Sequence, residues 1–66
     1  MQIKVNGETD RFPENSTIRD ILSARELPEE IVIVFLNGEM VRSESWNNVL
    51  VSADDRLEII KVVGGG

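Results

Sequence analysis

The chain has 66 residues, a formal net charge of −5 and 41% apolar residues. This length suits one domain with a small core, and the apolar content is too high for a disordered chain. With no Cys and no His, disulfides, a thiol nucleophile, an imidazole base and the usual zinc ligands are excluded, and we expect no metal site. The acidic balance argues against nucleic acid, and indicates either simple solubility or a partner with a basic docking surface.

The first predicted element is a β-hairpin. Residues 1–5 alternate between apolar and polar, and Asn6-Gly7 is the strongest short hairpin signal because both residue types tolerate positive φ. Residues 8–12 return as the second strand. A two-residue turn sets Ile3 opposite Asp10, so we expect Asp10 near a frayed edge, where an inward charge blocks edge-to-edge pairing.

A helix is predicted over residues 17–26. Its apolar stripe is Ile18, Ile21 and Leu22. Thr17 is a good N-cap, and Asp20 three residues later completes a pattern that resembles a capping box. Pro28 is expected to end the helix.

Residues 31–42 are predicted to form a second hairpin, with its turn at Asn37-Gly38. Opposed residues share a face, and this turn sets Ile33 opposite Arg42. Because Arg42 favours water, one set of apolar side chains must point away from the helix. The outward set is Ile33, Phe35 and Met40. The inward set is Val32, Val34 and Val41.

The remaining chain supplies a connection and a last strand. We expect the connection to close one end of the core with Trp46, Val49 and Leu50. A lone Trp in so small a domain is usually core, so we do not interpret Trp46 as a binding anchor. Residues 56–63 are predicted as the last strand. Its inward side chains are Leu57 and Ile59, and its outward ones are Glu58, Ile60 and Val62.

The order strand, strand, helix, strand, strand, strand predicts an α+β fold. One helix would lie across one face of a five-stranded mixed sheet, with the last strand beside the first, because otherwise two long edges stay open. This is the β-grasp, or ubiquitin-like, roll. We expect one domain over residues 1–63 and a flexible glycine tail over residues 64–66. No targeting signal or membrane-length apolar run is present, so we expect a cytoplasmic protein.

The polar pairs offer little catalytic chemistry. Glu29-Glu30 and Asp54-Asp55 are adjacent in sequence and do not fit Ca²⁺-loop spacing. We interpret both pairs as solvated turn residues. The serines have no His partner, so a hydrolase triad is not available.

The chain ends in three glycines, residues 64–66. No Lys or Ser/Thr follows them, so they are not a phosphate loop. Three interpretations remain: a frayed end or engineering scar, a linker cut short, or a working terminus. The start at Met1 is what a complete product would show, and glycine, lacking Cβ, can thread a narrow channel. In the third interpretation Gly66 supplies a free α-carboxylate, which becomes an electrophile once a partner enzyme adenylates it with ATP.

The outward apolar side chains form a predicted partner-binding face. Its members are Ile33, Phe35, Met40, Ile60 and Val62. An exposed apolar patch is usually an interaction site, and this one lies on the sheet face that leads into the tail. The alternative is that another subunit or an unnoticed element covers the patch, although we expect a monomer when the protein is free.

With these features in place, the chain resembles the ThiS family of sulfur-carrier proteins from thiamin biosynthesis. The resemblance spans essentially the whole length, through MQIKVNGE, the helix start at Thr17, FLNGEMVR followed by Trp46, and DRLEIIKVVGGG. A terminal Gly-Gly also occurs in molybdopterin-synthase small subunits and ubiquitin, but the short length and the spacing from Arg42 to Trp46 favour the thiamin carrier. SADD departs from the family, where Gly-Asp is frequent; because Asp54 can reach a left-handed conformation, we expect altered turn stability and intact function.

The resemblance implies a cycle in which the carrier is a substrate of its partners and not an enzyme. A ThiF-type adenylyltransferase would activate the Gly66 carboxylate with ATP and Mg²⁺, and a persulfide from a cysteine desulfurase would convert it to a thiocarboxylate. Thiazole synthase would then take the sulfur, and the carrier itself would bind no cofactor. The working positions would be Gly65 and Gly66, with Gly64 in the flexible arm. The family docking surface would correspond to Ile33, Phe35, Ile60 and Val62.

Two other functions stay open. The chain could carry sulfur to another acceptor, such as molybdopterin, a tRNA base or an amino-acid precursor. It could also be a ubiquitin-like interaction module whose tail has no covalent role. An enzyme in its own right ranks last, because no catalytic constellation is present.

Overall fold

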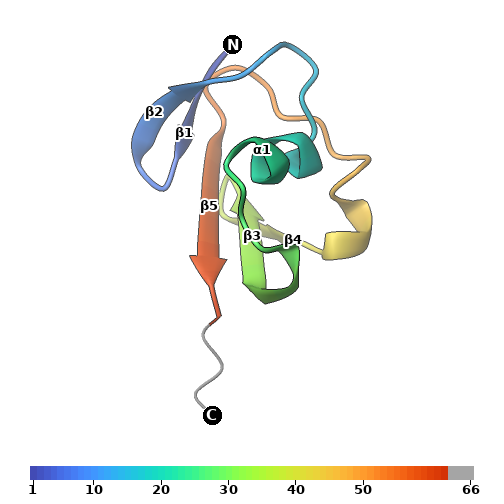
Figure 1. Ribbon diagram of the computed structural model, residues 1–66. Helices are drawn as coiled ribbons and strands as arrows, with labels where there is room; N and C mark the ends of the chain where they lie inside the picture. Colours follow the sequence, from blue (N-terminus) through green and yellow to red (C-terminus); the bar gives the residue numbers. More distant parts are fainter. Residues whose placement is uncertain (63–66) are drawn as a thin grey trace.

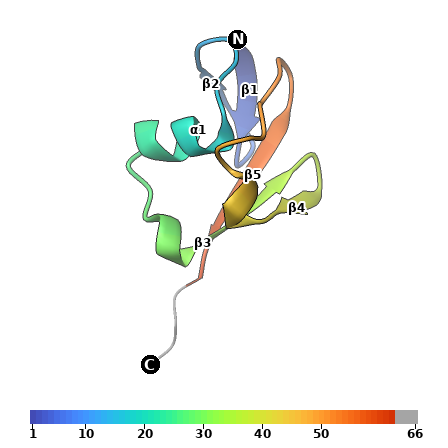
Figure 2. The ribbon, with the colours of Figure 1, turned by 90° about the vertical axis from the view of Figure 1, so that its right-hand side faces the viewer.

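The computed structural model describes residues 1–62, and in them α1 (Ile18–Ala24) lies on one face of a five-stranded sheet (Figures 1 and 2). The strands are β1 (Gln2–Val5), β2 (Glu8–Arg11), β3 (Val32–Leu36), β4 (Glu39–Val41) and β5 (Arg56–Lys61), and the short 3₁₀ helices are η1 (Glu29–Ile31) and η2 (Ser43–Ser45). The sheet order is β2-β1-β5-β3-β4, with β5 parallel to β1 and antiparallel to β3. The predicted β-grasp fold is therefore confirmed. The expected domain end at residue 63 and the tail over residues 64–66 lie outside the described residues.

Both hairpins have the predicted turns, and the pairings next to the turns are as predicted. The two Asn-Gly pairs have positive φ at each residue, from 52° at both asparagines to 84° at Gly7 and 88° at Gly38, as a tight turn matched to the twist of the strands requires. Ile3 pairs with Asp10 in the first hairpin. In the second, Val34 pairs with Val41 and Phe35 with Met40. The turn chemistry alone therefore determines which side chains share a face.

The asparagine side chains of these turns also bind β5. The backbone N–H of Ile59 donates to Asn6 Oδ1 at 2.7 Å, and Asn6 Nδ2 donates to the Ile59 carbonyl at 3.3 Å. On the other side of β5, the Arg56 N–H donates to Asn37 Oδ1 at 2.8 Å. A primary amide carries both a donor and an acceptor, so it can replace a peptide group where a neighbouring strand turns away. The two amides thus extend the hydrogen bonding of β5 beyond its regular ladders.

The start of α1 is a capping box. The Asp20 N–H donates to the Thr17 hydroxyl at 3.1 Å, and the Thr17 N–H donates to the Asp20 carboxylate at 2.9 Å. Two of the helix's otherwise unpaired N–H groups are satisfied in this way. The predicted N-terminus is confirmed.

The helix ends earlier than the predicted boundary at residue 26, and Pro28 does not end it. α1 stops at Ala24, and Glu26 takes a left-handed conformation with φ of 54°. The Leu27 N–H then donates to the Leu22 carbonyl at 3.0 Å, which is the closing bond of a Schellman motif. Glycine normally occupies the left-handed position of this motif, so the Glu gave no stop signal in the sequence.

The inward charge on β2, Asp10, has a partner in Arg25, the residue that follows α1. β2 is an edge strand, as expected for Asp10, and the Asp10 carboxylate forms an ion pair with Arg25 at 2.8 Å. Both side chains remain partly exposed, so the pair contributes at most about 1 kcal/mol to stability.

The core fills the space between α1 and the sheet. Its buried apolar residues are Ile3, Val5, Ile18, Ile21, Leu22, Val32, Val34, Trp46, Val51, Leu57 and Ile59. Trp46 is 2% exposed and donates its indole N–H to the Val41 carbonyl at 3.0 Å. Its prediction as a core residue is confirmed, and Val49 packs partly buried against the core.

Three details of the predicted elements are wrong. Leu50 is 54% exposed, and its neighbour Val51 is buried instead, because the Val51 N–H donates to the Ser16 carbonyl and turns that side chain inward. Ile31 belongs to η1 and not to the strand, since its N–H bonds back to the Pro28 carbonyl. Arg42 lies just beyond β4, so its expected pairing with Ile33 is not formed.

The asparagine contacts with β5 lead to a stability prediction. Asn6→Gly keeps a residue that accepts positive φ and removes both side-chain bonds to Ile59, so the free energy of unfolding should fall by about 1–3 kcal/mol. Asn15 also has positive φ, at 65°, and its side chain makes no hydrogen bond within residues 1–62. Asn15→Gly is therefore the matched control, expected to change stability by less than about 0.5 kcal/mol. Urea unfolding measures both, and equal losses would contradict this role for Asn6.

Candidate functional site

The carboxyl end of the described chain leaves from the centre of the sheet. β5 pairs with β1 on one edge and β3 on the other, and its far end lies at the opposite end of the molecule from Met1 (Figure 1). The last described residue, Val62, donates its N–H to the Ile31 carbonyl at 2.6 Å. Gly64, Gly65 and Gly66 lie outside the described residues, and their roles remain predictions.

The sheet face opposite α1 is apolar beside the end of β5. Four of the predicted residues are well exposed: Ile33 at 37%, Met40 at 60%, Ile60 at 49% and Val62 at 48%. Alternate residues are buried against the helix, as Ile59 shows at 8%. The predicted outward orientation is therefore confirmed, whereas binding by this face remains a prediction. We call Ile33, Phe35, Met40, Ile60 and Val62 the apolar patch.

One member of the apolar patch is less exposed than expected. Phe35 is partly rather than fully exposed on the outer face, because it lies on β3 between Met40 of β4 and Glu58 of β5 in the register of the sheet. Ile31, which the sequence reasoning placed in a strand, is 42% exposed and its carbonyl holds Val62. It adds an unpredicted apolar side chain next to the end of β5.

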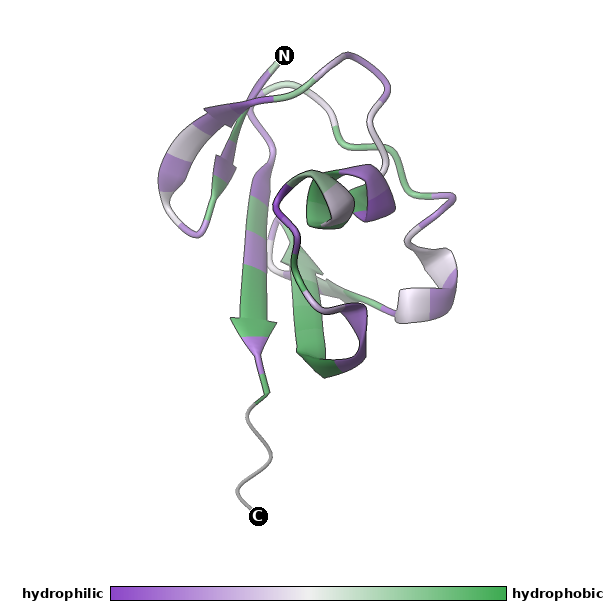
Figure 3. Ribbon diagram, viewed as in Figure 1, coloured by the Kyte–Doolittle hydropathy of each residue, from purple (hydrophilic) through white to green (hydrophobic). Residues whose placement is uncertain are grey.

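The other half of this face is polar and mostly basic. Lys4 on β1 pairs with Arg56 on β5. Figure 3 shows hydrophilic and hydrophobic residues alternating in the first half of β5, followed by a longer hydrophobic stretch and a hydrophilic tip. Both cations and Glu58 line an open groove of about 620 Å³ that borders the two Asn-Gly turns. The sequence pattern did not predict this groove, because the groove forms only when the fold places the two turns on opposite sides of β5.

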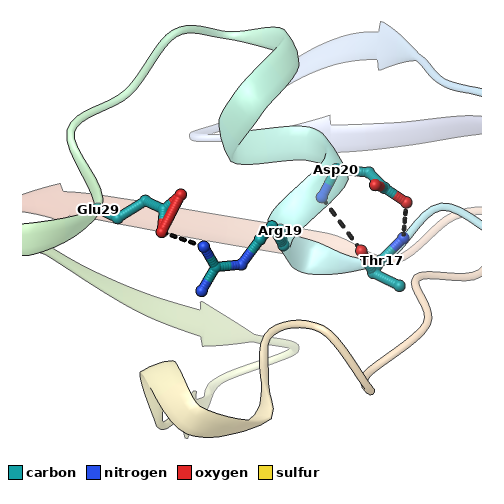
Figure 4. Close-up of polar contacts among 4 residues, drawn as sticks. All are labelled: Thr17, Arg19, Asp20 and Glu29. Atoms are coloured by element: carbon teal, nitrogen blue, oxygen red, sulfur yellow. Dashed lines mark hydrogen bonds and ion pairs between the residues drawn. The ribbon is translucent and has the colours of Figure 1, made fainter.

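On the helix side, one ion pair joins α1 to η1. Arg19 of α1 donates to the Glu29 carboxylate of η1 (Figure 4). Both side chains are about one-third exposed, so Glu29 is paired as well as partly solvated, and Glu30 is exposed as expected. Within residues 1–62 no group of three or more acidic side chains is arranged to hold a metal ion.

The two residues of the second acidic pair, Asp54 and Asp55, also differ in their surroundings. Asp54 is exposed with φ of 68°, so the expected left-handed conformation is confirmed. Asp55 is half-buried and not simply solvated. Its carboxylate accepts from the Ser52 N–H at 2.8 Å and from Asn37 Nδ2 at 3.1 Å. It thereby ties the turn before β5 to the second hairpin.

Within the part of the chain that the structure describes, no helix is both long enough and apolar enough to span a membrane.

The fold and the apolar patch define a β-grasp protein with one exposed sheet face. Comparison with known proteins narrows this class: residues 2–66 match the ThiS family. The chain is 34% identical over 65 residues to the sulfur carrier protein ThiS of Bacillus subtilis, covering 97% of this chain and 98% of that protein. The chain therefore belongs to the ThiS family and is a sulfur carrier protein of thiamin biosynthesis.

Solved structures and a larger relative agree with this assignment. The crystal structure of the thiamine biosynthesis protein ThiS from Geobacter metallireducens superposes with a TM-score of 0.87 at 32% identity, covering all of both chains. A thiazole synthase of Paramagnetospirillum magneticum is 33% identical over 66 residues, which are 100% of this chain and 20% of that protein. A similar segment thus also occurs within a longer protein.

The alternation along β5 gives a test of the two faces. Ile59→Ala should lower the free energy of unfolding by about 2–4 kcal/mol, because it leaves a cavity in the core. Ile60→Ala removes the same atoms from a half-exposed position and should cost about 1 kcal/mol or less. Urea unfolding of the two neighbouring variants measures the difference, and similar losses would show that the outer face is covered in solution.

Proposed function

We propose that the Gly66 carboxylate is the reactive group of this protein, and that it becomes a thiocarboxylate which donates sulfur to the thiazole ring of thiamin. The match to the ThiS family through residue 66 carries the proposal. The position of β5 supports it, because the central strand ends beside an exposed apolar patch.

The chemistry requires no catalytic side chain from the carrier. A carboxylate oxygen of Gly66 attacks the α-phosphorus of ATP, and pyrophosphate leaves. The terminal sulfur of a persulfide then attacks the acyl carbon of the adenylate, and AMP leaves. A second thiol cleaves the S–S bond of this acyl persulfide, forming a disulfide and releasing the thiocarboxylate. A chain without Cys or His can serve as substrate in each step, while its partners supply the acids, bases and thiols.

The body of the protein provides the binding energy for these partners. The apolar patch presents aliphatic side chains to solvent, and burying them against an enzyme is favourable in proportion to the area removed from water. Gly64, Gly65 and Gly66 have no side chains, so the end of the chain suits a narrow active site. Recognition and reaction thus occupy different parts of the molecule.

The partners follow from this cycle. We propose a ThiF-type adenylyltransferase that uses ATP and Mg²⁺, a cysteine desulfurase that supplies the persulfide, and thiazole synthase as the sulfur acceptor. The relative named thiazole synthase, which contains a similar segment, supports the last of these. A cytoplasmic location fits the dependence on ATP.

Removal of the terminal residue tests the proposed reaction. The variant lacking Gly66 should keep the wild-type unfolding midpoint and lose ATP–pyrophosphate exchange by the adenylyltransferase, because the carboxylate is one residue short of the active site. Circular dichroism checks the fold, and radioactive pyrophosphate incorporation measures the exchange.

A matched control extends the tail by one residue. A chain with an added glycine keeps a free carboxylate at the wrong distance and should also lose exchange. Undiminished exchange in the variant lacking Gly66 would contradict the proposal.

A further inference from the structure

The sheet face opposite α1 has the opposite charge balance to the rest of the protein. The ionisable residues at its outward strand positions are Lys4, Arg11, Arg56 and Glu58. Three of these four are cations, whereas the whole chain has twelve Asp and Glu against seven Lys and Arg. A protein that is acidic overall therefore shows a basic surface on the face that also carries the apolar patch.

These cations form no ion pair within the described protein, and the carboxylates that line the hollows beside Lys4 and Arg56 are those of Glu58 and Asp54. The ion pairs among residues 1–62 join Arg19 to Glu29, Arg25 to Asp10 and Arg42 to Glu44. Lys4, Arg11 and Arg56 take part in none of them. Lys4 and Arg56 are also register partners on neighbouring strands, and like charges in that relation repel each other. The two cations thus lie on neighbouring strands without an ion-pair partner, where an external anion can bind.

Lys4 and Arg56 lie together at two hollows in the protein surface. Lys4 and Arg56 line both the groove of about 620 Å³ beside the Asn-Gly turns and an adjoining hollow of about 240 Å³. Gly7 and Gly38 border the larger groove, and neither has another atom within 4 Å of the place where a Cβ would stand. The groove is open from outside, and side chains from another protein can enter it.

The groove continues into the apolar patch. Glu58 lines the groove and is the register partner of Phe35 in the patch. Arg56 and Ile60 are four residues apart on β5, which is roughly 13 Å along a strand. An ordinary interface buries about 800 Å² and about 20–30 residues on each partner, whereas the patch consists of Ile33, Phe35, Met40, Ile60 and Val62 only. An interface of ordinary size must therefore extend beyond the patch.

We propose that Lys4 and Arg56 form a receptor for carboxylate side chains of the partner protein that receives the tail. This inference rests on the proposed function. The partner's surface would combine an apolar contact for Ile60 and its neighbours with Asp or Glu side chains roughly 13 Å away, toward the Asn-Gly turns. A protein is favoured over nucleic acid, because the apolar patch is part of the same surface and the chain's net charge of −5 repels phosphates.

The role of the two cations is to speed encounter and fix orientation, while the apolar patch holds the complex together. Exposed charges at the rim of an interface act mainly on the association rate and its salt dependence. Loss of apolar contacts acts mainly on the dissociation rate. Substitutions of the two cations should therefore slow association, and substitutions in the apolar patch should speed dissociation.

Binding kinetics with the adenylyltransferase and with thiazole synthase test the proposal. The Lys4→Gln/Arg56→Gln variant should associate about tenfold more slowly at low salt with at least one of them, and the difference should shrink below about twofold near 1 M NaCl, where the Debye length is roughly 3 Å. Met40→Ala should raise the dissociation rate at either salt concentration.

The matched control changes the net charge equally on the helix side. Ser23→Glu/Asn47→Asp adds two negative charges at exposed positions and should leave the association rate within about twofold of wild type. Equal association of the Lys4→Gln/Arg56→Gln variant and this control with both enzymes would overturn the carboxylate receptor, while tail-dependent exchange would leave the proposed function standing. Failure of the wild-type chain to bind either enzyme would overturn both.

Discussion

Hydrogen bonding along both edges of β5 is the constraint on which the other features of this protein depend. β1 and β3 supply regular ladders to this strand, and Asn6 and Asn37 add amide bonds where those ladders stop. A strand held on both edges has a fixed position and a fixed alternation of side chains. The chain therefore leaves the sheet from a well-defined place, and each inward residue of β5 determines which neighbours face outward.

This alternation gives the sheet two faces with separate tasks. The inner face packs against α1 and provides the stability, which in a chain of 66 residues leaves little margin for apolar side chains elsewhere. The outer face nevertheless exposes the apolar patch and keeps Lys4 and Arg56 side by side without an ion pair in the described protein. Neither feature stabilises the free chain. Both are understandable if partner enzymes recognise this face while the carboxyl end enters their active sites.

The sequence allowed the fold and the outward apolar residues to be predicted, because Asn-Gly turns set the register and alternation then assigns the faces. One miss is local: the helix ends early at a left-handed Glu26, a position that glycine normally occupies. The other misses have a common physical cause. Val51 rather than Leu50 turns inward through a backbone bond to a distant loop. The role of Asp55 and the groove at Lys4 likewise depend on contacts between segments far apart in sequence. Local patterns carry no information about such contacts.

The intact mass of the protein, purified from cells that are making thiamin, tests the central claim most directly. The account predicts a population heavier by one sulfur-for-oxygen exchange, with fragmentation placing the sulfur on Gly66 and alkylation of the thiocarboxylate removing it from sulfur transfer. A carrier that supports thiazole formation while its terminal carboxylate never gains sulfur, or gains it on another residue, would contradict the account.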